Sequence, residues 1–553
     1  MYQYSEQDHQ QLSSRLTIFR KQIERHVEGK LSDEEFRPLR LQNGLYFQRH
    51  APMLRVAVPY GMLSSRQLRK LAYIASTFDK GYCHISTRQN IQFNWPELKS
   101  IPTILSSLSE VEMHATQTSG NCIRNVTSDP FAGVAPDEIV DPRPYCEIIR
   151  QWSTGHPEFA YLPRKFKIAV SGSQQDRAIV EAHDIGLQLI KNQHDEIGFR
   201  VWVGGGLGRT PVIGSIINHF VPQYDLLDYL QAILRVYNRF GRRDNKYKAR
   251  IKILVRALGL HSFKEQVEHE WKTLSSFSRP LTDGDLDFAR SFFTAPKYQH
   301  FDDTPDEKLA IHSQADMPFS NWVNHNTHPH KVKGYRAVVI SLKSDIAAPG
   351  DISSSQLEAL ASITERYSFS EIRTTHQQNL VLADVQIFDL YPLWQALSNI
   401  NLASPNIGTL TDMICCPGLD FCSLANAPSI PIAEIIRKRF DSLDYLYDIG
   451  DISLNISGCV NACAHHHLAN IGILGVDKKG EPFYQVSLGG SKTKQCRLGK
   501  ILGPAFSKEQ IPSVVELIIK IFLQHRLEGE SFISTFDRIG LSTFKETIYG
   551  HSH

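Results

Sequence analysis

An internal repeat is the feature that most constrains the fold of this 553-residue chain. The segment 64–74, SSRQLRKLAYI, reappears at 353–363 as SSSQLEALASI. The same offset of 289 residues carries Gln89-Asn90 onto Gln378-Asn379. A single match of this kind can arise by chance, whereas further matches in the same order point to a duplication.

Two more segments repeat at almost the same distance. IAVSG at 168–172 matches LNISG at 454–458, and FRVWVGG at 199–205 matches YQVSLGG at 484–490, with offsets of 286 and 285 residues. The chain is therefore predicted to be an internally duplicated α/β (α+β) protein. Each copy holds a small strand–helix–strand module and then a larger sheet domain. Duplicated halves commonly pack about a pseudo-two-fold axis, so we expect a shared site at their interface.

The repeat also divides the chain into segments. Residues 1–45 are expected to form a charged helical arm. The expected boundaries of the four units are 46–100 and 101–325 in the first copy, and 326–398 and 399–553 in the second. A linker between the copies is expected within 275–330, where prolines accumulate without periodicity.

One helix of the first small module is predicted in detail, over Ser65–Phe78. Ser64 or Ser65 can cap its first turn, and one face is apolar, with Leu68, Leu71, Ala72 and Ala75. Strands are expected on both sides of this helix, at Val56–Pro59 and within Tyr82–Trp95.

Composition narrows the class of protein. The chain is 42% hydrophobic and 21% charged with a net charge of +2, which argues against bulk attraction to nucleic acid or to a membrane surface. The N-terminus lacks the basic and then apolar pattern of a signal peptide, and the most apolar run, 514–523, is interrupted by Glu516 and Lys520. Nine thinly spread cysteines are unlike a disulfide scaffold, so we expect a cytoplasmic protein.

Two cysteine pairs near the C-terminus indicate a metal centre. Five residues separate Cys416 from Cys422, and three separate Cys459 from Cys463. Four thiolates can hold either a tetrahedral zinc ion or a cubane iron–sulfur cluster. The five-residue gap exceeds the usual zinc spacing, so an iron–sulfur cluster is favoured, with a zinc-stapled binding protein as the alternative.

Cationic residues gather in the first copy, whereas the cysteine pairs are in the second. They are Arg55, Arg88, Arg124, Arg164, Lys165 and Lys167. The last three precede the segment whose repeat partner leads into Cys459. The repeat therefore predicts that these cations and the cluster approach each other across the axis. Taken singly, each cation would be interpreted as a solvated residue at a strand edge.

Three weaker patterns remain. VGGGLG at 203–208 resembles half of a dinucleotide fingerprint, and its repeat partner suggests a loop that approaches a large ligand. Arg235–Lys252 holds eight Lys or Arg residues against one acid, which suits a solvated helix, an anionic cofactor or a docking site better than nucleic acid. His465–His467 are expected beside the metal ligands rather than among them.

These motifs together resemble the sirohaem-dependent sulfite and nitrite reductases, over nearly the whole chain. The cysteine pairs resemble the family's cluster signature. Further similar segments are Met53–Arg55 with Pro59–Gly61, Ser86–Phe93, Arg124-Asn125 and Tyr161–Lys167. In detail the chain is most similar to the bacterial assimilatory sulfite reductase haemoproteins. The resemblance implies ferredoxin-like half-domains for the small modules and sirohaem-binding domains for the large ones.

The resemblance also implies a role for each residue. Cys416, Cys422, Cys459 and Cys463 would hold a [4Fe–4S] cluster, and Cys463 would also bind the sirohaem iron. Arg55, Arg124, Lys165 and Lys167 would line the catalytic pocket, and Arg88, Gln92 and Arg164 would bind the sirohaem carboxylates. The chain departs from the family pattern at His84, Asn94 and Gly120-Asn121, so no role is carried over there.

The activity that this resemblance implies is six-electron reduction of sulfite to hydrogen sulfide in sulfur assimilation. Reduction of nitrite to ammonia on the same scaffold is the alternative. The sequence shows no flavodoxin-like or nicotinamide-binding domain, so electrons are expected from a partner protein, either ferredoxin or a separate NADPH-dependent flavoprotein.

Overall fold

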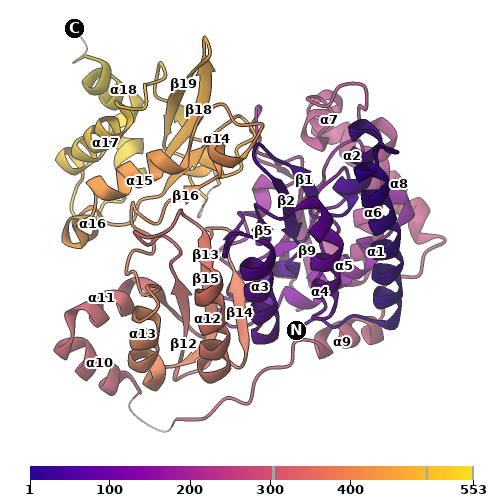
Figure 1. The fold of residues 1–553 in the computed structure, drawn as a ribbon, viewed down its shortest axis with the longest axis horizontal. Coiled ribbons are helices and arrows are strands. Elements are labelled where there is room, and N and C mark those ends of the chain that lie inside the picture. Colours follow the sequence, from indigo (N-terminus) through magenta and orange to yellow (C-terminus); the bar gives the residue numbers. More distant parts are fainter. Residues whose placement is uncertain (302–304, 493–495, 551–553) are drawn as a thin grey trace.

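A computed structural model describes residues 1–301, 305–492 and 496–550. Over these residues the chain forms four five-stranded sheets, two in each copy. Figure 1 shows the first copy on the right and the second on the left, with the small modules of the two copies side by side at the centre. The duplicated fold predicted from the repeat is therefore confirmed. The exact unit boundaries stay predictions.

The first 42 residues form two helices, α1 (Glu6–Val27) and α2 (Asp33–Gln42). Each begins with a capping box, in which the Ser5 or Ser32 hydroxyl accepts a backbone N–H three residues later and an acidic side chain bonds back. Phe19 and Phe36 anchor this arm in the core of the small modules.

The predicted helix of the first module is confirmed as α3 (Ser65–Phe78), with Ser64 as its N-cap. The predicted strand at Val56–Pro59 is wrong, because β2 spans Pro52–Val56 and a 3-10 turn begins at Pro59. Proline lacks the N–H that would extend the ladder. The region Tyr82–Trp95 forms two strands, β4 (Tyr82–Ile85) and β5 (Ile91–Phe93), joined by a tight turn.

The small modules exchange a strand. One sheet has the order β1 (Leu45–Phe47), β2, β5, β4, β13 (Asp351–Ser353), so its last strand comes from the second copy. The other has the equivalent order β11 (Thr327–Pro329), β12 (Tyr335–Ile340), β15 (Leu380–Gln386), β14 (Glu371–Thr374), β3 (Met62–Ser64). The exchange is reciprocal, so the two modules form one body around one core.

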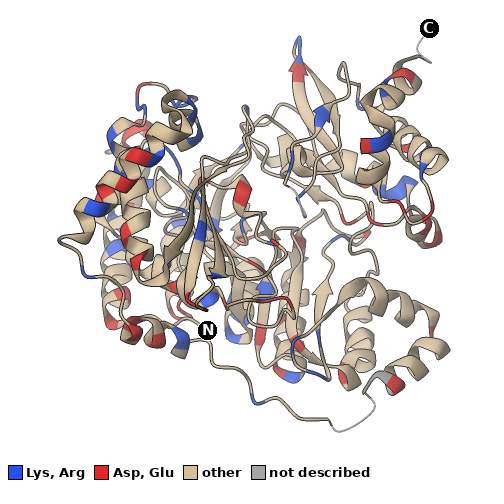
Figure 2. Cartoon of the chain, turned by 180° about the vertical axis from the view of Figure 1, so that it is seen from behind, with Lys and Arg blue, Asp and Glu red and all other residues tan. Residues whose placement is uncertain are grey.

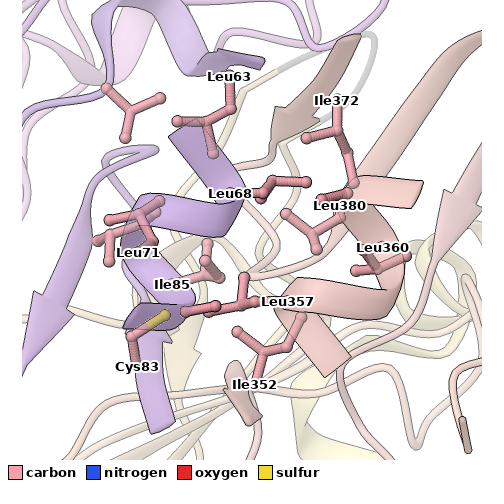
Figure 3. Packing of buried hydrophobic residues seen from close by; sticks show 14 of the residues in the cluster. Leu63, Leu68, Leu71, Cys83, Ile85, Ile352, Leu357, Leu360, Ile372 and Leu380 are labelled. Atoms are coloured by element: carbon pink, nitrogen blue, oxygen red, sulfur yellow. The ribbon is translucent and has the colours of Figure 1, made fainter. Parts of the chain in front are cut away.

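That core lies between α3 and its repeat partner α12 (Ser354–Tyr367). Leu68 and Leu71 of α3, Leu357 and Leu360 of α12, and strand residues such as Ile85 belong to this core, and Figure 3 shows Leu68 directed toward α12. All five side chains are at most 1% exposed. The repeated segment SSxQL is therefore explained by packing, since each copy presents the same helical face to the axis.

The large sheets share one topology. In the first copy the order is β10 (Ser215–Pro222), β9 (Ile197–Val203), β8 (Ile185–Lys191), β7 (Ile168–Ser171), β6 (Thr127–Ser128). In the second it is β20 (Lys500–Ile501), β19 (Glu481–Leu488), β18 (Ile471–Lys478), β17 (Leu454–Ser457), β16 (Ile414–Cys415). In both, the last three strands are parallel and the others antiparallel.

The remaining helices cover these sheets and join the units. In the first copy they are α4 (Ile101–Ser109), α5 (Arg143–Ser153), α6 (Leu226–Phe240), α7 (Ile251–Leu258), α8 (Leu260–Ser275) and α9 (Asp283–Ser291). In the second they are α10 (Pro305–Ala315), α11 (Met317–Asn326), α13 (Leu390–Ser398), α14 (Gly418–Phe421), α15 (Ile430–Arg439), α16 (Leu443–Ile449), α17 (Ile511–His525) and α18 (Phe532–Gly550). Part of the predicted linker, 302–304, lies outside the described residues. Among the described helices, none has the length and apolar character needed to span a membrane.

Candidate functional site

A cavity of about 690 Å³ lies where the copies meet, and we call it the chamber. Its volume falls in the range of cofactor sites. All eleven residues singled out from the sequence line it: Arg55, Arg88, Gln92, Arg124, Arg164, Lys165, Lys167, Cys416, Cys422, Cys459 and Cys463. The structure thus brings the cations of one copy and the cysteines of the other together, as the repeat predicts. Their individual roles stay predictions.

Strand direction explains how the first copy supplies the cations. Strands β6 and β7 are parallel neighbours, and their amino ends lie at the same edge of the sheet. Arg124 lies shortly before β6, and Lys165 and Lys167 lie directly before β7. The Arg124 N–H donates to the carbonyl of Phe166 (2.8 Å), which holds the two segments side by side.

The second copy presents the opposite edge of its sheet. Strands β16 and β17 are also parallel neighbours, and Cys416 and Cys459 follow their carboxyl ends. Cys422 ends the one-turn helix α14. The hydroxyl of Thr87, from the first copy, donates to the carbonyl of Cys463 (2.6 Å) and so fixes the second cysteine pair against the chamber.

Two arginines of the chamber are held by backbone carbonyls rather than by acids. Arg124 donates to the carbonyls of Thr118 (2.7 Å) and Gly120 (2.8 Å). Arg55 donates to the Thr118 carbonyl (3.3 Å) and to the side-chain oxygen of Gln92 (2.9 Å), which lies opposite it on β5. Neutral partners orient both guanidinium groups without cancelling their charge, so the pair is arranged to receive an anion.

The two lysines lie deep in the protein with their exposed surface toward the chamber. Burial, followed by the charge of Arg124, lowers the pKa of Lys165 to about 7. Burial, followed by the charge of Lys165, holds the pKa of Lys167 well below its ordinary value. An anion in the chamber would favour the protonated ammonium groups. Lysines with this protonation range can deliver protons near neutral pH.

Arg88 extends the cationic wall from the turn between β4 and β5. It donates to the carbonyl of Asn125 (2.7 Å) and the hydroxyl of Thr127 (2.9 Å), and it contacts the ring of His183 (2.6 Å). Burial lowers the pKa of Arg88 to about 9. Arg164 has one long contact, to the side-chain oxygen of Asn121 (3.4 Å).

The thiol environment suits a cluster. The N–H of Gly458 donates to the Cys416 sulfur (3.1 Å), and the Asn461 amide donates to the Cys459 sulfur (3.4 Å). Burial raises the pKa of Cys416 to about 12, so metal binding must displace its proton. No three His, Cys, Asp or Glu side chains within the described part of the chain converge tightly enough to hold one metal ion. The five-residue gap between Cys416 and Cys422 exceeds the usual spacing of a zinc-binding pair and suits a cubane cluster.

The charge of the chamber suits a polycarboxylate macrocycle. Nine lysines and arginines line it, against two acids, Asp33 and Glu34, near α2. Among the residues that the structure describes, most of these cations have no acidic partner at the chamber, and Arg250, which pairs with Asp184, is an exception, so an anionic occupant would offset the cost of burying them. A sirohaem with eight carboxylates, together with an anionic substrate, would provide it.

Arg250 and Tyr46 are among the chamber residues that sequence reasoning missed. Arg250 lies in the basic stretch 235–252 and pairs with the fully buried Asp184 (2.7 Å). Tyr46 lies on β1, with the Arg55 guanidinium 5.1 Å from its ring centre. Burial would raise the pKa of Tyr46, but Arg124 and Arg55 outweigh it and hold that pKa below its ordinary value. A lone tyrosine in a short strand carries no signal of this in the sequence.

Several cations of the basic stretch have partners within the protein. Arg235 pairs with Glu158 (2.7 Å), Arg242 pairs with Asp244, and the Lys252 ammonium donates to the carbonyls of Gly206 and Leu207 (both 3.0 Å). Figure 2 shows basic and acidic residues interleaved along the helices rather than segregated. These bonds from Lys252 hold the glycine-rich loop at 203–208 in place, and Leu207 of this loop lines the chamber.

The positions that depart from the family pattern also lie at the chamber. His84, Asn94, Gly120 and Asn121 all line it. The His84 ring contacts Asp351 (2.7 Å) from the second copy, and Asn121 contacts Arg164. His467 lies beside the second cysteine pair, and its ring contacts the Gly208 carbonyl (3.1 Å).

Comparison with protein families gives matches over both copies. The model "Nitrite and sulphite reductase 4Fe-4S domain" matches residues 119–274 and 409–552. The model "Nitrite/Sulfite reductase ferredoxin-like half domain" matches residues 46–111 and 328–400. Both models match twice, in alternation, as the duplicated sheets require.

Individual relatives agree. The "Sulfite reductase [ferredoxin]" of Mycobacterium tuberculosis is 29% identical over 490 residues, which cover 87% of this chain and 81% of that protein. The "Assimilatory ferredoxin-dependent nitrite reductase" of Haloferax mediterranei is 26% identical over 506 residues, covering 87% and 80%. The solved structure of the Mycobacterium tuberculosis NirA protein superposes with a TM-score of 0.76 at 28% identity, covering 93% of this chain and 92% of NirA. The chain therefore belongs to the nitrite and sulphite reductase family, whose members hold a [4Fe–4S] cluster together with sirohaem.

Proposed function

We propose that this chain is an assimilatory sulfite reductase that converts sulfite to hydrogen sulfide. The observation that carries the proposal is the chamber, in which four cysteines of one copy face the cations of the other. The similarity to the "Sulfite reductase [ferredoxin]" of Mycobacterium tuberculosis, at 29% identity, supports sulfite as the substrate.

The cofactors, when bound, supply the six electrons that no side chain can store. Cys416, Cys422, Cys459 and Cys463 are proposed to hold the cluster, with Cys463 also bound to the sirohaem iron. Arg88, Gln92 and Arg164 are proposed to bind sirohaem carboxylates. Neighbouring N–H groups, such as that of Gly458, stabilise the negative charge on sulfur.

Arg55 and Arg124 are proposed to bind and orient the substrate anion. The carbonyls of Thr118 and Gly120 fix both guanidinium groups before substrate arrives. This preorganisation lowers the cost of ordering the pocket when oxygen atoms acquire negative charge.

Lys165 and Lys167 are proposed to supply protons as sulfite oxygens leave as water. Each ammonium group can hold a proton toward the chamber, and burial, followed by the charge of Arg124 for Lys165 and of Lys165 for Lys167, lowers the pKa of each lysine and favours release of the proton. Burial keeps bulk water from competing for the same transfers.

Nitrite is the second candidate substrate, because a nitrite reductase matches over 506 residues at 26% identity. Steady-state turnover with sulfite and with nitrite, measured on one preparation with the same reductant, tests the assignment. We expect a higher kcat/KM for sulfite. A higher value for nitrite would reverse the order of the two candidates.

Ferredoxin is the proposed electron donor, since the names of both relatives specify it. A separate NADPH-dependent flavoprotein is the alternative. Supplying reduced ferredoxin or a flavoprotein with NADPH to the same enzyme distinguishes them, and faster sulfide formation with ferredoxin is expected. The reaction is proposed to take place in the cytoplasm, where thiolate ligands stay reduced.

A further inference from the structure

Gln378 connects the two copies beside the cysteine ligands. It lies in the turn between β14 and β15 and is 1% exposed. Its amide nitrogen donates to the carbonyl of Ile85 (3.1 Å), and its oxygen accepts the N–H of Cys415 (2.9 Å). An N–H can only donate and a carbonyl can only accept, so these two bonds fix which end of the amide is nitrogen.

The orientation of this amide determines the tautomer of His84. The second hydrogen of Gln378 Nε2 faces His84 Nε2 at 3.0 Å, so that ring nitrogen must be the acceptor. The ring proton is therefore on Nδ1, which donates to Asp351 Oδ1 (2.7 Å). Asp351 stands opposite His84 because the exchanged strand β13 pairs with β4 in that register.

The equivalent glutamine of the first copy, Gln89, lacks this arrangement. It makes the matching bonds, to the Thr374 carbonyl (3.0 Å) and from the Ser128 N–H (3.1 Å). The residues equivalent to His84 and Asp351 are Arg373 and Met62, which also face each other across the exchanged pair. The Arg373 guanidinium turns away, to the carbonyls of Pro130 (3.0 Å) and Ala132 (2.6 Å). The imidazole contact is thus specific to the side that carries the cysteines.

The hydrogen bond from the Cys415 N–H to Gln378 satisfies a backbone group on an edge strand. Strand β16 is the edge of its sheet, so an N–H on its outer side has no strand partner. Cys415 is 1% exposed, and an unpaired N–H there would be costly. Cys416 follows directly, and its own N–H bonds back to Ile456 (3.1 Å). The two bonds together fix the backbone on both sides of the peptide that leads to the Cys416 sulfur.

We propose that His84 is a positioning residue for the cluster. Asp351 holds His84 as the Nδ1–H tautomer. His84 then accepts a hydrogen bond from Gln378 and helps to orient the amide whose oxygen accepts the Cys415 N–H. In this way His84 helps to fix the strand that leads to Cys416. The inference rests on the proposed role of Cys416 as a cluster ligand. Mutating direct partners of metal ligands typically alters metal affinity or activity by about 10- to 100-fold, and His84, which acts through Gln378 and Cys415, is expected at the lower end of that range.

Hydrogen exchange on the full-length purified protein tests the contact directly. His84→Leu removes the ring acceptor, so we expect hydrogen exchange of the Cys415 amide to become about tenfold faster. We also expect the rate of iron loss to a chelator to rise, toward the lower end of a range of about 10- to 100-fold. Gln89→Leu is the matched control. It removes the equivalent bond to Ser128 and should accelerate exchange there, with Cys415 exchange and iron retention unchanged.

A double-mutant cycle shows whether His84 acts through Gln378. Gln378→Leu removes the acceptor of the Cys415 N–H itself, so its effects should be at least as large as those of His84→Leu, and the double variant should add nothing further to them. Additive effects would overturn the proposal.

His84→Phe decides the matter if His84→Leu does not fold, since it preserves the volume of the ring. A phenyl ring cannot accept a hydrogen bond in the ring plane from Gln378 Nε2, so that amide hydrogen loses its partner. Faster Cys415 exchange is expected, and unchanged exchange would overturn the proposal. Iron, sulfide and sulfite turnover of the unmodified protein test the proposed function separately. A chain without a cluster would refute that function, whereas a loaded chain with unaffected variants would refute only the role of His84.

Discussion

The chamber and the equivalent region across the pseudo-two-fold axis, which we call the counterpart, are built from the same strands but carry opposite chemistry. Where Cys416, Cys459 and Cys463 follow β16 and β17, the positions that follow β6 and β7 hold Asp129, Ser173 and Arg177. These three bond to one another: Asp129 accepts from Ser173 Oγ (3.1 Å) and from Arg177 Nε (2.8 Å). A buried ion pair thus stands where the other copy presents thiols.

At the amino ends of these strands the first copy carries the chamber residues and the second copy does not. Lys165 and Lys167 precede β7, and the positions equivalent to them before β17 are Asp451 and Ser453. Each copy therefore keeps one functional edge, the amino ends in the first and the carboxyl ends in the second. Duplication created two equivalent interfaces, and divergence made one a cofactor chamber while filling the other with an internal salt bridge.

The largest expected effect breaks the chamber itself. Cys463→Ser removes the sulfur proposed to serve both cofactors, so sulfite reduction should fall below detection and the visible spectrum of the coupled centre should be lost. Absorption spectra and iron content measure this. Cys415→Ala, one residue from a proposed ligand, is the control and should retain colour. A normal spectrum in Cys463→Ser would contradict the assignment.

The next largest effect is expected at the two chamber lysines, where cofactor binding and proton delivery can be measured separately. Lys165→Met and Lys167→Met remove a proton donor while leaving every proposed cofactor ligand in place. Both variants should load normally yet lose about 10²- to 10⁴-fold in turnover. Lys191→Met, on the exposed end of β8, should keep full activity. Unimpaired turnover in fully loaded chamber variants would show that the protons come from elsewhere.

The third prediction concerns the counterpart. Arg177→Met leaves the carboxylate of Asp129 buried and unpaired, so it should destabilise the fold by about 3 kcal/mol. Replacing both residues, as Asp129→Leu with Arg177→Met, should recover most of that loss, because the second partner of Arg177, the carboxylate of Asp137, is 30% exposed and can be solvated. Thermal unfolding measures the difference, and iron content should stay constant throughout. A loss of iron in Arg177→Met would mean that the counterpart still supports the chamber.

Much of the site followed from the sequence because the repeat related distant segments. The alignment of 168–172 with 454–458 is enough to place Lys167 and Cys459 at equivalent strands, and the helix Ser65–Phe78 follows from its cap and apolar face. Spacing alone paired the cysteines. These are local or periodic signals that survive in a single sequence.

Other features depend on contacts that a sequence does not encode locally. The exchange of β3 and β13 requires knowing which strand completes which sheet, and both strands are only three residues long. The His84–Asp351 contact exists only because of that exchange. Tyr46 acquires its lowered pKa from Arg124, 78 positions away in the chain.

The smallest expected effect is a pH dependence of anion binding in the chamber. Burial, followed by the charge of Arg124, lowers the pKa of Lys165, and a bound anion raises it. Above the pKa that Lys165 has before the anion binds, binding must take up a proton, so affinity should fall by up to about tenfold per pH unit as the pH rises, and below that pKa this lysine adds no dependence. Nitrite suits the measurement because it does not titrate between about pH 6 and 9. Spectroscopic titration of the oxidised enzyme gives the affinity, and Lys165→Met should flatten the profile. If the unmodified enzyme were already flat, Lys165 would be charged without an anion, and the chamber would be preorganised by its cations alone.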